Sequence, residues 1–194
     1  IPLFPLSAVL FPGGRMPLQI FEPRYLDLIS TSLKHDSGFG VVWLREGSET
    51  HVPENTVDTR LAQVGTYARI VDWDSLANGL LGVTIEGSKK FRVLSSFQRQ
   101  DNLHMAEVEW IDQEALEPLP EDAEGMTDLL SQLLDHPHIS RLKLNPDVGD
   151  VSTLSCLLAQ LLPIEELLKF KLLALTNPLN RLQQLAELLD EYSQ

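Results

Sequence analysis

The spacing of apolar residues changes once along the chain, near residues 114–121. Before this point, short runs alternate between apolar and polar residues, as half-buried β-strands do. After it, leucine recurs every three or four residues, which is the period of an amphipathic helix. We therefore expect an α+β fold, with a strand-rich part over residues 1–115 and a helical part over residues 116–194.

The start of the chain is broken by prolines into short apolar pieces. Proline fixes φ and lacks an N–H, so these pieces do not suit helix interiors or central strands. We expect extended runs at residues 3–4, 8–11 and 18–21, a turn at residues 12–14, and one helix over residues 23–34. The prolines are Pro2, Pro5, Pro12, Pro17 and Pro23. The helix carries an apolar stripe of Tyr25, Leu26, Ile29 and Leu33.

Further runs of strand length follow this helix. They cover residues 39–44, 61–71, 80–86, 90–97 and 104–111. Asn78-Gly79 is a strong hairpin signal, and Gly87-Ser88 is expected to form a second turn. Closely spaced strands joined by hairpins predict a mostly antiparallel sheet or a small barrel.

The stretch from Arg45 to Arg60 is polar and rich in charged residues. Structureless loops of this length are uncommon in compact domains, and they are usually mobile or functional. We therefore expect a long loop here that borders any binding site nearby.

Four leucine-rich helices are expected in the helical part. The first runs from Glu121 to His136, and the second starts at Asp150 or Ser152 and ends near residue 162. The third starts at Pro163 and the fourth at Pro178. Because this punctuation ends each helix too early for a sustained heptad repeat, the pattern predicts a helical bundle rather than a coiled coil.

The chain has a formal net charge of −13, from 15 basic and 28 acidic residues. Such a surface repels phosphate backbones and anionic lipids, so we expect neither a nucleic-acid nor a membrane partner. We interpret the acidic residues as a solvated surface, with a docking face for basic partners as the alternative. No run approaches the roughly eighteen apolar residues that indicate a membrane helix.

Cys156 is the only cysteine, so neither an internal disulfide nor a multi-cysteine zinc site can form. It lies in an apolar helical context, which predicts a buried and unreactive thiol. This use of cysteine fits the reducing cytoplasm. The first residue is Ile1 rather than methionine, which predicts that a few residues precede it.

Signals for cofactor binding are weak. The segment Gly82–Lys89 departs from a phosphate-binding loop, because Ser88 precedes Lys89 and strand-like alternation follows. His136 and His138 are the closest of the five histidines, and a spacing of two residues does not place both on one helical face. We therefore expect no cofactor and no metal site.

Signals for catalysis are equally weak. No Gly-x-Ser-x-Gly segment occurs, although serines and lysines are numerous enough for a Ser–Lys dyad. Asp72 and Asp74 flank Trp73 as an imaginable acid pair, but beside an Asn-Gly turn they are expected to solvate the loop.

A set of residues within the first ninety-three positions resembles one family in type and order. The set comprises residues 2–6, 9–13, 17–18, 20–25, 39–42 and 64–66, Gly87, and residues 91–93. It resembles the N-terminal domain of the ATP-dependent Lon proteases, in the form that also occurs as a stand-alone protein, and more distantly the Lon-like domain of cereblon. The structural motif positions are Pro5, Phe11, Pro12, Gly13, Phe21, Glu22, Pro23, Arg24, Tyr25, Gly65, Phe91 and Arg92. Leu161-Leu162 and Arg181-Leu182 resemble the family's helical half more weakly.

The resemblance implies a PUA-like β-barrel, mostly antiparallel, followed by a C-terminal helical bundle. In Lon proteases this part recognises substrates and helps to assemble the hexamer, while the ATPase and peptidase lie in later domains. Neither of those domains occurs in this chain. The resemblance thus implies a non-enzymatic polypeptide-binding or adaptor module with polypeptide clients. The candidate site is a groove between barrel and bundle, bordered by residues 45–60.

Two alternative functions stay open. One is a small hydrolase with an unrecognised site. The other is RNA binding, because PUA-like barrels elsewhere bind RNA; the charge of −13 and the lack of a basic patch with interleaved aromatic residues disfavour it.

Glu22 and Arg24 stand at the start of the first predicted helix. Glu22 can accept hydrogen bonds from free N–H groups there, and Arg24 can pair with an acid elsewhere. We expect a structural role for both residues, with a catalytic role as the alternative.

Overall fold

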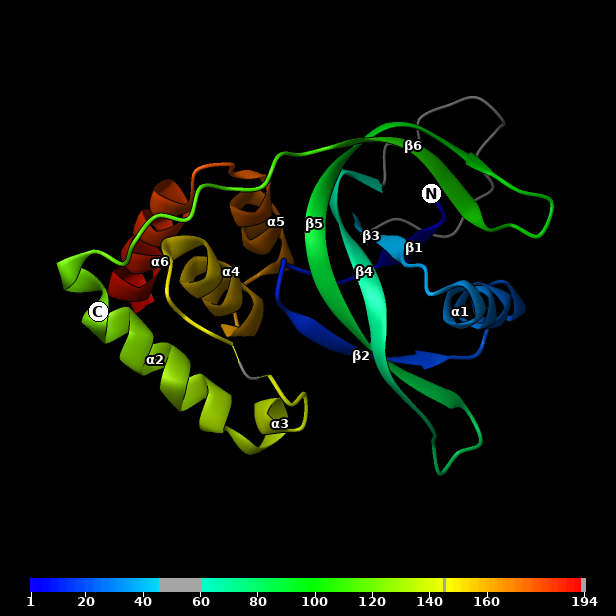
Figure 1. The fold of residues 1–194 in the computed structure, drawn as a ribbon, viewed down its shortest axis with the longest axis horizontal. Coiled ribbons are helices and arrows are strands. Elements are labelled where there is room, and N and C mark those ends of the chain that lie inside the picture. The colour runs from blue at the N-terminus through cyan, green and yellow to red at the C-terminus, as the bar shows by residue number, and fades with distance from the viewer. Residues whose placement is uncertain (46–60, 145, 193–194) are drawn as a thin grey trace.

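The computed structural model describes residues 1–45, 61–144 and 146–192, with the strands gathered at one end and most helices at the other (Figure 1). The strands are β1 (Leu3–Leu6), β2 (Arg15–Ile20), β3 (Phe39–Leu44), β4 (Leu61–Ser75), β5 (Leu81–Gln98) and β6 (His104–Trp110). The helices are α1 (Pro23–His35), the 3-10 turn η1 (Glu121–Ala123), α2 (Glu124–Asp135), α3 (Pro137–Ser140), α4 (Val151–Leu161), α5 (Glu166–Ala174) and α6 (Pro178–Tyr192).

The six strands form one mixed sheet with the order β1-β3-β4-β5-β2, and β6 pairs with β5. The β1–β3 pair is parallel and the other pairs are antiparallel. The long β5 pairs with β2 along its first half and with β6 along its second half. This arrangement confirms the predicted α+β fold with a mostly antiparallel sheet.

The strand ladders leave the sheet open, and the start of the chain links its ends. The Ile1 amino group donates to the carbonyl oxygen of Ala106 at 2.7 Å, and the Ala106 N–H donates to the carbonyl oxygen of Ile1 at 2.9 Å. An isolated bridge also joins Pro2 to Met105. The segment before β1 therefore brings β6 next to β1. The strands bury their side chains in two clusters, one shared with α1 and one formed by Leu3, Val42, Leu61, Phe91 and Ala106.

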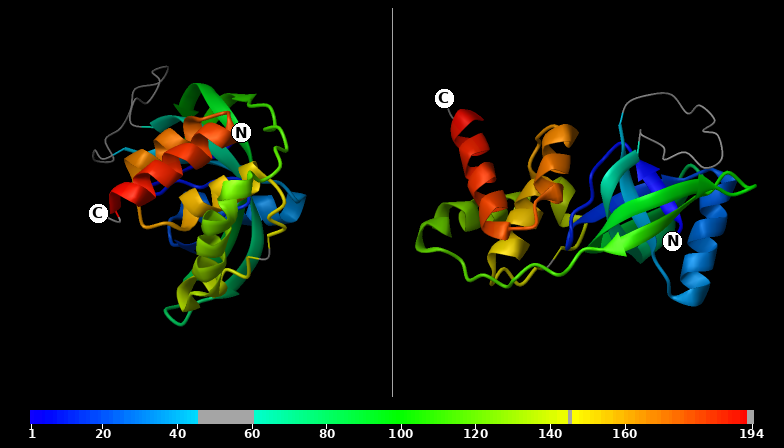
Figure 2. Two further views of the ribbon diagram at one scale, coloured as in Figure 1. Left: turned by 90° about the vertical axis from the view of Figure 1, so that its left-hand side faces the viewer. Right: turned by 90° about the horizontal axis from the view of Figure 1, so that it is seen from above.

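Helix α1 covers the end of the sheet that lies far from the other helices (Figure 2). The helix expected over residues 23–34 runs from Pro23 to His35, and Pro23 occupies its first turn. Its buried side chains Tyr25, Leu28 and Ile29 pack in one core with Phe4 and other side chains of the sheet. Of the predicted stripe, Tyr25 and Ile29 are buried, but Leu26 and Leu33 are 38% and 44% exposed, and Leu28 packs on the sheet in their place.

The turn predicted at Gly87-Ser88 is wrong, because β5 continues through it. The N–H of Gly13 donates to the carbonyl oxygen of Gly87 at 2.8 Å, and the N–H of Gly87 donates to that of Gly14 at 2.9 Å. A Cβ atom at Gly87 would overlap the carbonyl oxygen of Phe11. Glycine is thus required by a close approach of the N-terminal segment rather than by a turn.

Three smaller differences concern one helix start, one extended run and one short helix. Helix α5 begins at Glu166 and not at Pro163, since Pro163 follows the end of α4 as a stop signal. The extended run expected at residues 8–11 belongs to none of the strands, and the short α3 was not predicted.

Residues 8–11 instead join the sheet to the helices. Val9 and Phe11 are buried in the helical core, while Leu10 between them is buried in the core of the sheet and α1. The N–H of Val9 donates to Glu166 Oε2 at 2.7 Å, and the N–H of Phe11 donates to Gln160 Oε1 at 2.8 Å. The alternation of an extended chain thus places neighbouring side chains in two different cores.

Helix α4 is the centre of the helical part. It is buried along most of its length, and α2, α5 and α6 pack around it. Asp150 caps it by accepting a hydrogen bond from the N–H of Thr153 at 2.9 Å. Across the described residues, every helix is too short or too polar to span a bilayer.

Candidate functional site

A hollow of about 800 Å³ lies between the sheet and α4, in the position expected for a groove between the two parts. One wall is built by β4, β5 and the end of β6, and the other by the start of α4. The connection after β6, residues 111–116, runs along the hollow. Residues 46–60 of the loop predicted to border this groove lie outside the described residues.

The sheet wall is aromatic and basic. Tyr67 and Arg69 lie on the same face of β4 because side chains two residues apart point the same way. The Tyr67 ring meets the Trp110 ring edge-on at 5.5 Å, and the Lys89 ammonium lies 4.1 Å from the centroid of the Trp110 ring. Trp110 stays 42% exposed, and Leu116, which also lines the hollow, is 74% exposed. The hollow thus presents apolar surface to solvent beside two cations.

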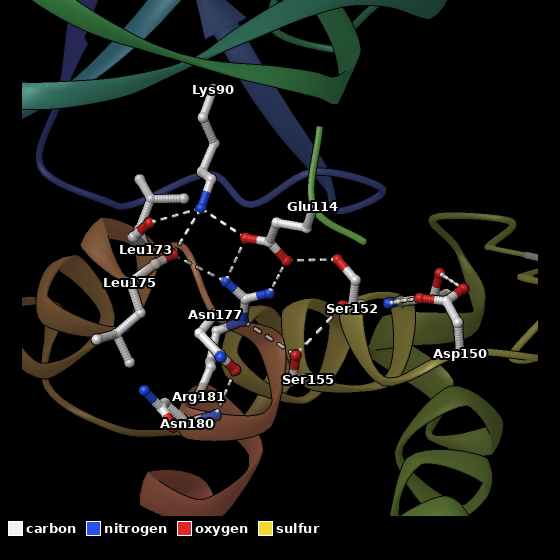
Figure 3. Close-up of polar contacts among 11 residues, drawn as sticks. Lys90, Glu114, Asp150, Ser152, Ser155, Leu173, Leu175, Asn177, Asn180 and Arg181 are labelled. Atoms are coloured by element: carbon white, nitrogen blue, oxygen red, sulfur yellow. Dashed lines mark hydrogen bonds and ion pairs between the residues drawn. The ribbon is translucent and has the colours of Figure 1, made fainter. Parts of the chain in front are cut away.

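The floor of the hollow is a buried ionic cluster around Glu114 (Figure 3). Arg181 Nη1 donates to Glu114 Oε1 at 2.9 Å, and Arg181 Nη2 donates to Glu114 Oε2. Lys90 Nζ also donates to Oε1 at 2.7 Å, and the Ser152 hydroxyl donates to Oε2 at 2.6 Å. The single carboxylate therefore binds groups from β5, α4 and α6.

The two cations of this cluster reach further into the helical part. Lys90 Nζ donates to the carbonyl oxygens of Leu173 and Leu175, at 3.2 and 2.7 Å. Arg181 Nε donates to the Ser155 hydroxyl at 3.0 Å. The cluster thus fixes the sheet, the connection at residues 111–116 and three helices against one another (Figure 3).

The electrostatics of the floor oppose acid–base or nucleophilic chemistry. Burial alone would raise the pKa of Glu114, but hydrogen bonds from Arg181, Lys90 and Ser152 outweigh it and lower the pKa to about 2. Burial raises the pKa of the neighbouring Cys156 thiol to about 11. At neutral pH the carboxylate is therefore a fixed anion and the thiol is protonated.

A second hollow of about 810 Å³ lies beside the start of α1 and contains the motif residues 21–25. Phe21 is 67% exposed, whereas Tyr25 is buried and stacks on Phe4 with a centroid distance of 4.0 Å. The Glu22 side chain makes no cap hydrogen bond to α1 and accepts from Arg24 Nε at 2.8 Å instead. The acid that pairs with Arg24 is thus its near neighbour in sequence.

The remaining motif residues are spread over the fold. Phe11 and Phe91 are fully buried, and Gly65 lies where a Cβ would clash with the carbonyl oxygen of Val41. Arg92 forms an exposed pair with Glu109 at 3.2 Å. Pro5 lies in β1, Pro12 bridges to Gly87, Gly13 has a φ of 75°, and Pro23 starts α1. Most motif residues thus lie around the sheet, and only Pro12 and Gly13 of the motif line the first hollow.

Metal binding finds no support in residues 1–45, 61–144 and 146–192, where no three potential His, Cys, Asp or Glu ligands cluster. The His136 and His138 rings stack with a centroid distance of 5.5 Å, and both are exposed. Asp72 and Asp74 lie in β4 and not in the loop expected for them, and each accepts a hydrogen bond from the next residue's N–H, at 3.0 and 2.7 Å.

Sequence reasoning did not single out Lys90, Trp110 or Glu114 as site residues. Arg181 was noted only within a weak family motif. Its position next to Leu182, on the apolar stripe of α6, could have marked it as a site residue. A charged residue at a core position needs a buried partner of opposite charge.

Comparisons with known proteins indicate one family for this chain. A family model described as the ATP-dependent protease La (LON) substrate-binding domain covers residues 1–191. The chain is 31% identical over 99 residues to Lon protease 2 of Myxococcus xanthus, and 30% identical over 104 residues to the Lon protease of Anaeromyxobacter dehalogenans. These matches cover 50% and 53% of this chain and 12% of each relative. The chain thus matches a small fraction of these proteases.

Two solved structures extend the match. The crystal structure of a Lon N-terminal domain protein from Xanthomonas campestris superposes with a TM-score of 0.74 and 31% identity, over 96% of both chains. The N-terminal domain of the Mycobacterium avium complex Lon protease, at 14% identity and a TM-score of 0.62 over 96% of both chains, supports the fold alone. The chain therefore belongs to the family of LON substrate-binding domains.

Proposed function

We propose that this protein is a non-enzymatic polypeptide-binding module that acts as an adaptor, and that the hollow between the sheet and α4 is its binding site. The observation that carries the proposal is the exposed apolar surface of Trp110 and Leu116 above a rigid ionic floor. Aromatic side chains on such a floor supply large contact area at a low entropic cost, as polypeptide-binding hot spots do.

The size of the hollow supports a segment of chain as the ligand. Its volume of about 800 Å³ is enough for a few side chains of an extended segment, because pockets of about 300–1,000 Å³ enclose most of a drug-sized ligand. The floor offers neither a proton shuttle nor a nucleophile at neutral pH, because Glu114 and Cys156 are held in their charged and protonated forms. Binding without turnover is the function that this chemistry supports.

The use of cysteine favours a cytoplasmic location, and the net charge favours a protein over a nucleic acid as the partner. The single cysteine is buried and unpaired, which suits a reducing compartment. The net charge of −13 disfavours nucleic acid. We also propose that residues 1–115 and 116–194 are two subdomains, joined by the connection that lines the hollow.

Binding of a labelled, reduced and alkylated α-lactalbumin, an unfolded polypeptide, tests the proposal by fluorescence anisotropy. We expect Trp110→Ala to weaken binding by about ten-fold or more, as loss of a hot-spot residue does. Leu116→Ser removes a side chain that is 74% exposed, so it weakens binding without unfolding the protein. Trp73→Ala is the matched control, because Trp73 is 61% exposed on the β4–β5 hairpin, away from the hollow.

If the wild type, Trp110→Ala and Leu116→Ser bind the unfolded α-lactalbumin equally, the hollow is not the binding site. The same mixtures, with and without ATP, are also analysed for cleavage products on gels. Cleavage that a single substitution abolishes would establish the hydrolase alternative and overturn the proposal of a module without enzymatic activity.

A further inference from the structure

Among the described residues, two cations on the sheet wall of the hollow have no acidic partner. In the part of the chain that the structure describes, the Arg69 guanidinium makes no hydrogen bond or ion pair, and Lys89 contacts only the Trp110 ring. Glu86 faces Arg69 across the β4–β5 ladder, but its carboxylate accepts from Arg15 Nε at 2.6 Å. The cross-strand acid that would neutralise Arg69 is thus already paired.

The acids that line the same hollow are mostly engaged as well. Glu114 is bound by Arg181, Lys90 and Ser152 in the floor. The Asp150 carboxylate accepts from both the N–H and the hydroxyl of Thr153, at 2.9 and 2.7 Å. Asp112, which is exposed, is the remaining acid of the lining. Three cations and three acids therefore line the hollow, and among the described residues Arg69 and Lys89 are the two of these cations that no acid pairs with, on a chain whose net charge is −13.

We propose that the hollow selects polypeptide segments in which an Asp or Glu side chain lies next to an aromatic or aliphatic residue. The carboxylate pairs with Arg69 and Lys89, and the apolar neighbour packs on Trp110 and Leu116. This inference rests on the proposed polypeptide-binding function and names the class of segment that it binds.

Geometry favours a side-chain carboxylate over a chain end. Arg69 and Lys89 are both exposed rather than enclosed, so a side chain of a continuous segment reaches them. The planar guanidinium of Arg69 can bind both oxygens of one carboxylate. Each exposed ion pair contributes a factor of about two to five in affinity, and salt weakens it. Both pairs together therefore give about ten-fold discrimination.

The test compares three labelled peptides that are acetylated and amidated at their ends. Each carries Phe-Leu in a Ser/Gly background, flanked by Glu, by Gln or by Lys. We expect the wild-type protein to bind the Glu peptide about ten-fold more tightly than the Gln peptide at low salt, and high salt to reduce this ratio. The double variant Arg69→Gln/Lys89→Gln binds both peptides equally.

The control variant Lys34→Gln/Arg141→Gln changes the net charge by the same amount at exposed residues outside the hollow, and it keeps the preference for Glu. Urea unfolding midpoints of both double variants are compared with that of the wild type. Equal midpoints exclude a loss of stability, so the change in affinity then comes from the two cations. A preference for Glu that survives in Arg69→Gln/Lys89→Gln overturns the assignment to these residues.

The remaining outcomes separate the two proposals. Equal binding of the Glu and Gln peptides overturns the acidic preference and leaves polypeptide binding standing. Tightest binding of the Lys peptide also overturns the preference, since the surface charge then dominates. If a Gln peptide with a free C-terminus binds like the Glu peptide, the assignment to a side-chain carboxylate is wrong. If no peptide and no unfolded protein binds, the proposed function itself fails.

Discussion

Arg181 of α6 and Glu114 of the connection after β6 form a bidentate ion pair that is almost completely buried. The Arg181 side chain is 0% exposed and that of Glu114 is 7% exposed. Transferring two charges from water into an interior is costly, so such a pair adds little stability over a well-packed apolar pair of similar size, but the loss of either partner alone is expensive. The pair therefore commits the chain to one arrangement of sheet and helices, which is the arrangement that builds the hollow.

Removing the cation should destabilise the protein strongly. We expect Arg181→Met to lower the free energy of unfolding by about 3–5 kcal/mol, because it leaves the buried Glu114 carboxylate with one cation in place of two. Urea unfolding followed by circular dichroism measures the change. Arg92→Met is the control, because the exposed Arg92–Glu109 pair should contribute no more than about 1 kcal/mol. Similar losses in both variants would show that burial does not set the cost.

The same carboxylate should make stability depend on acidic pH. The folded-state pKa of Glu114, about 2, lies below its unfolded value of 4.5, so unfolding takes up a proton. The stabilisation is fully present above pH 4.5 and is lost as the pH falls toward 2. The shift corresponds to a contribution on the order of 3 kcal/mol at neutral pH.

The variant Glu114→Gln isolates this contribution from that of the other carboxylates. We expect it to be less stable than the wild type at neutral pH, and we expect the difference in unfolding free energy to shrink as the pH falls from 4.5 toward 2. Urea titrations at a series of pH values measure this difference. Parallel pH profiles for the two proteins would contradict the assignment.

Replacing glycine by alanine should change the stability of the protein in opposite directions at Gly87 and at Gly125. Gly87→Ala places a Cβ against backbone atoms of Phe11 and should destabilise the protein by about 1–3 kcal/mol. Gly125→Ala in the first turn of α2 meets no atom within 4 Å and should stabilise it by about 0.5 kcal/mol. Thermal unfolding of both variants tests the contrast. If Gly87→Ala unfolds at the same temperature as the wild type, residues 11–14 shift at little cost in free energy.

Much of the fold followed from periodicity because each element buries one face or stripe. The stripe of α1 and the Asn-Gly hairpin of β4 and β5 are local signals, and the structure contains both elements. The prediction failed at Gly87, where the reason for glycine is a contact with Phe11, far away in sequence. It also failed at Pro163, where one proline can either end a helix or begin the next.

The candidate site was less accessible to sequence reasoning than the fold. Glu114 belongs to no helix or strand, so no periodic pattern marks it, and its partners come from residues 90, 152 and 181. The position of Arg181 on an apolar stripe indicates a buried charge but cannot name the acid that meets it. Trp110 ends the pattern of β6, and its exposure depends on the path of the connection that follows.

The outer edge of β4 gives a last prediction, about self-association. In the described residues, β4 pairs with β3 only up to Ala68, so its stretch from Arg69 to Ser75 has β5 on one side and no strand on the other. Unpaired edges invite pairing with another chain. Here the N–H of Trp73 donates to Asp72 Oδ1 and the N–H of Ser75 donates to Asp74 Oδ1. The two carboxylates occupy the edge donors, and Lys143 Nζ pairs with Asp72 Oδ2 at 3.3 Å beside the same edge.

Removing both carboxylates should therefore expose the edge. We expect Asp72→Ala/Asp74→Ala to form larger species than the wild type as concentration rises, with exposed Val71 and Trp73 strengthening the contact. Sedimentation velocity at several concentrations measures this shift. Asp27→Ala/Asp128→Ala, at exposed acids of α1 and α2, removes the same charge away from the edge and should sediment like the wild type. If both double variants associate equally, the lost net charge is the cause, and Asp72 and Asp74 do not specifically prevent pairing at the β4 edge.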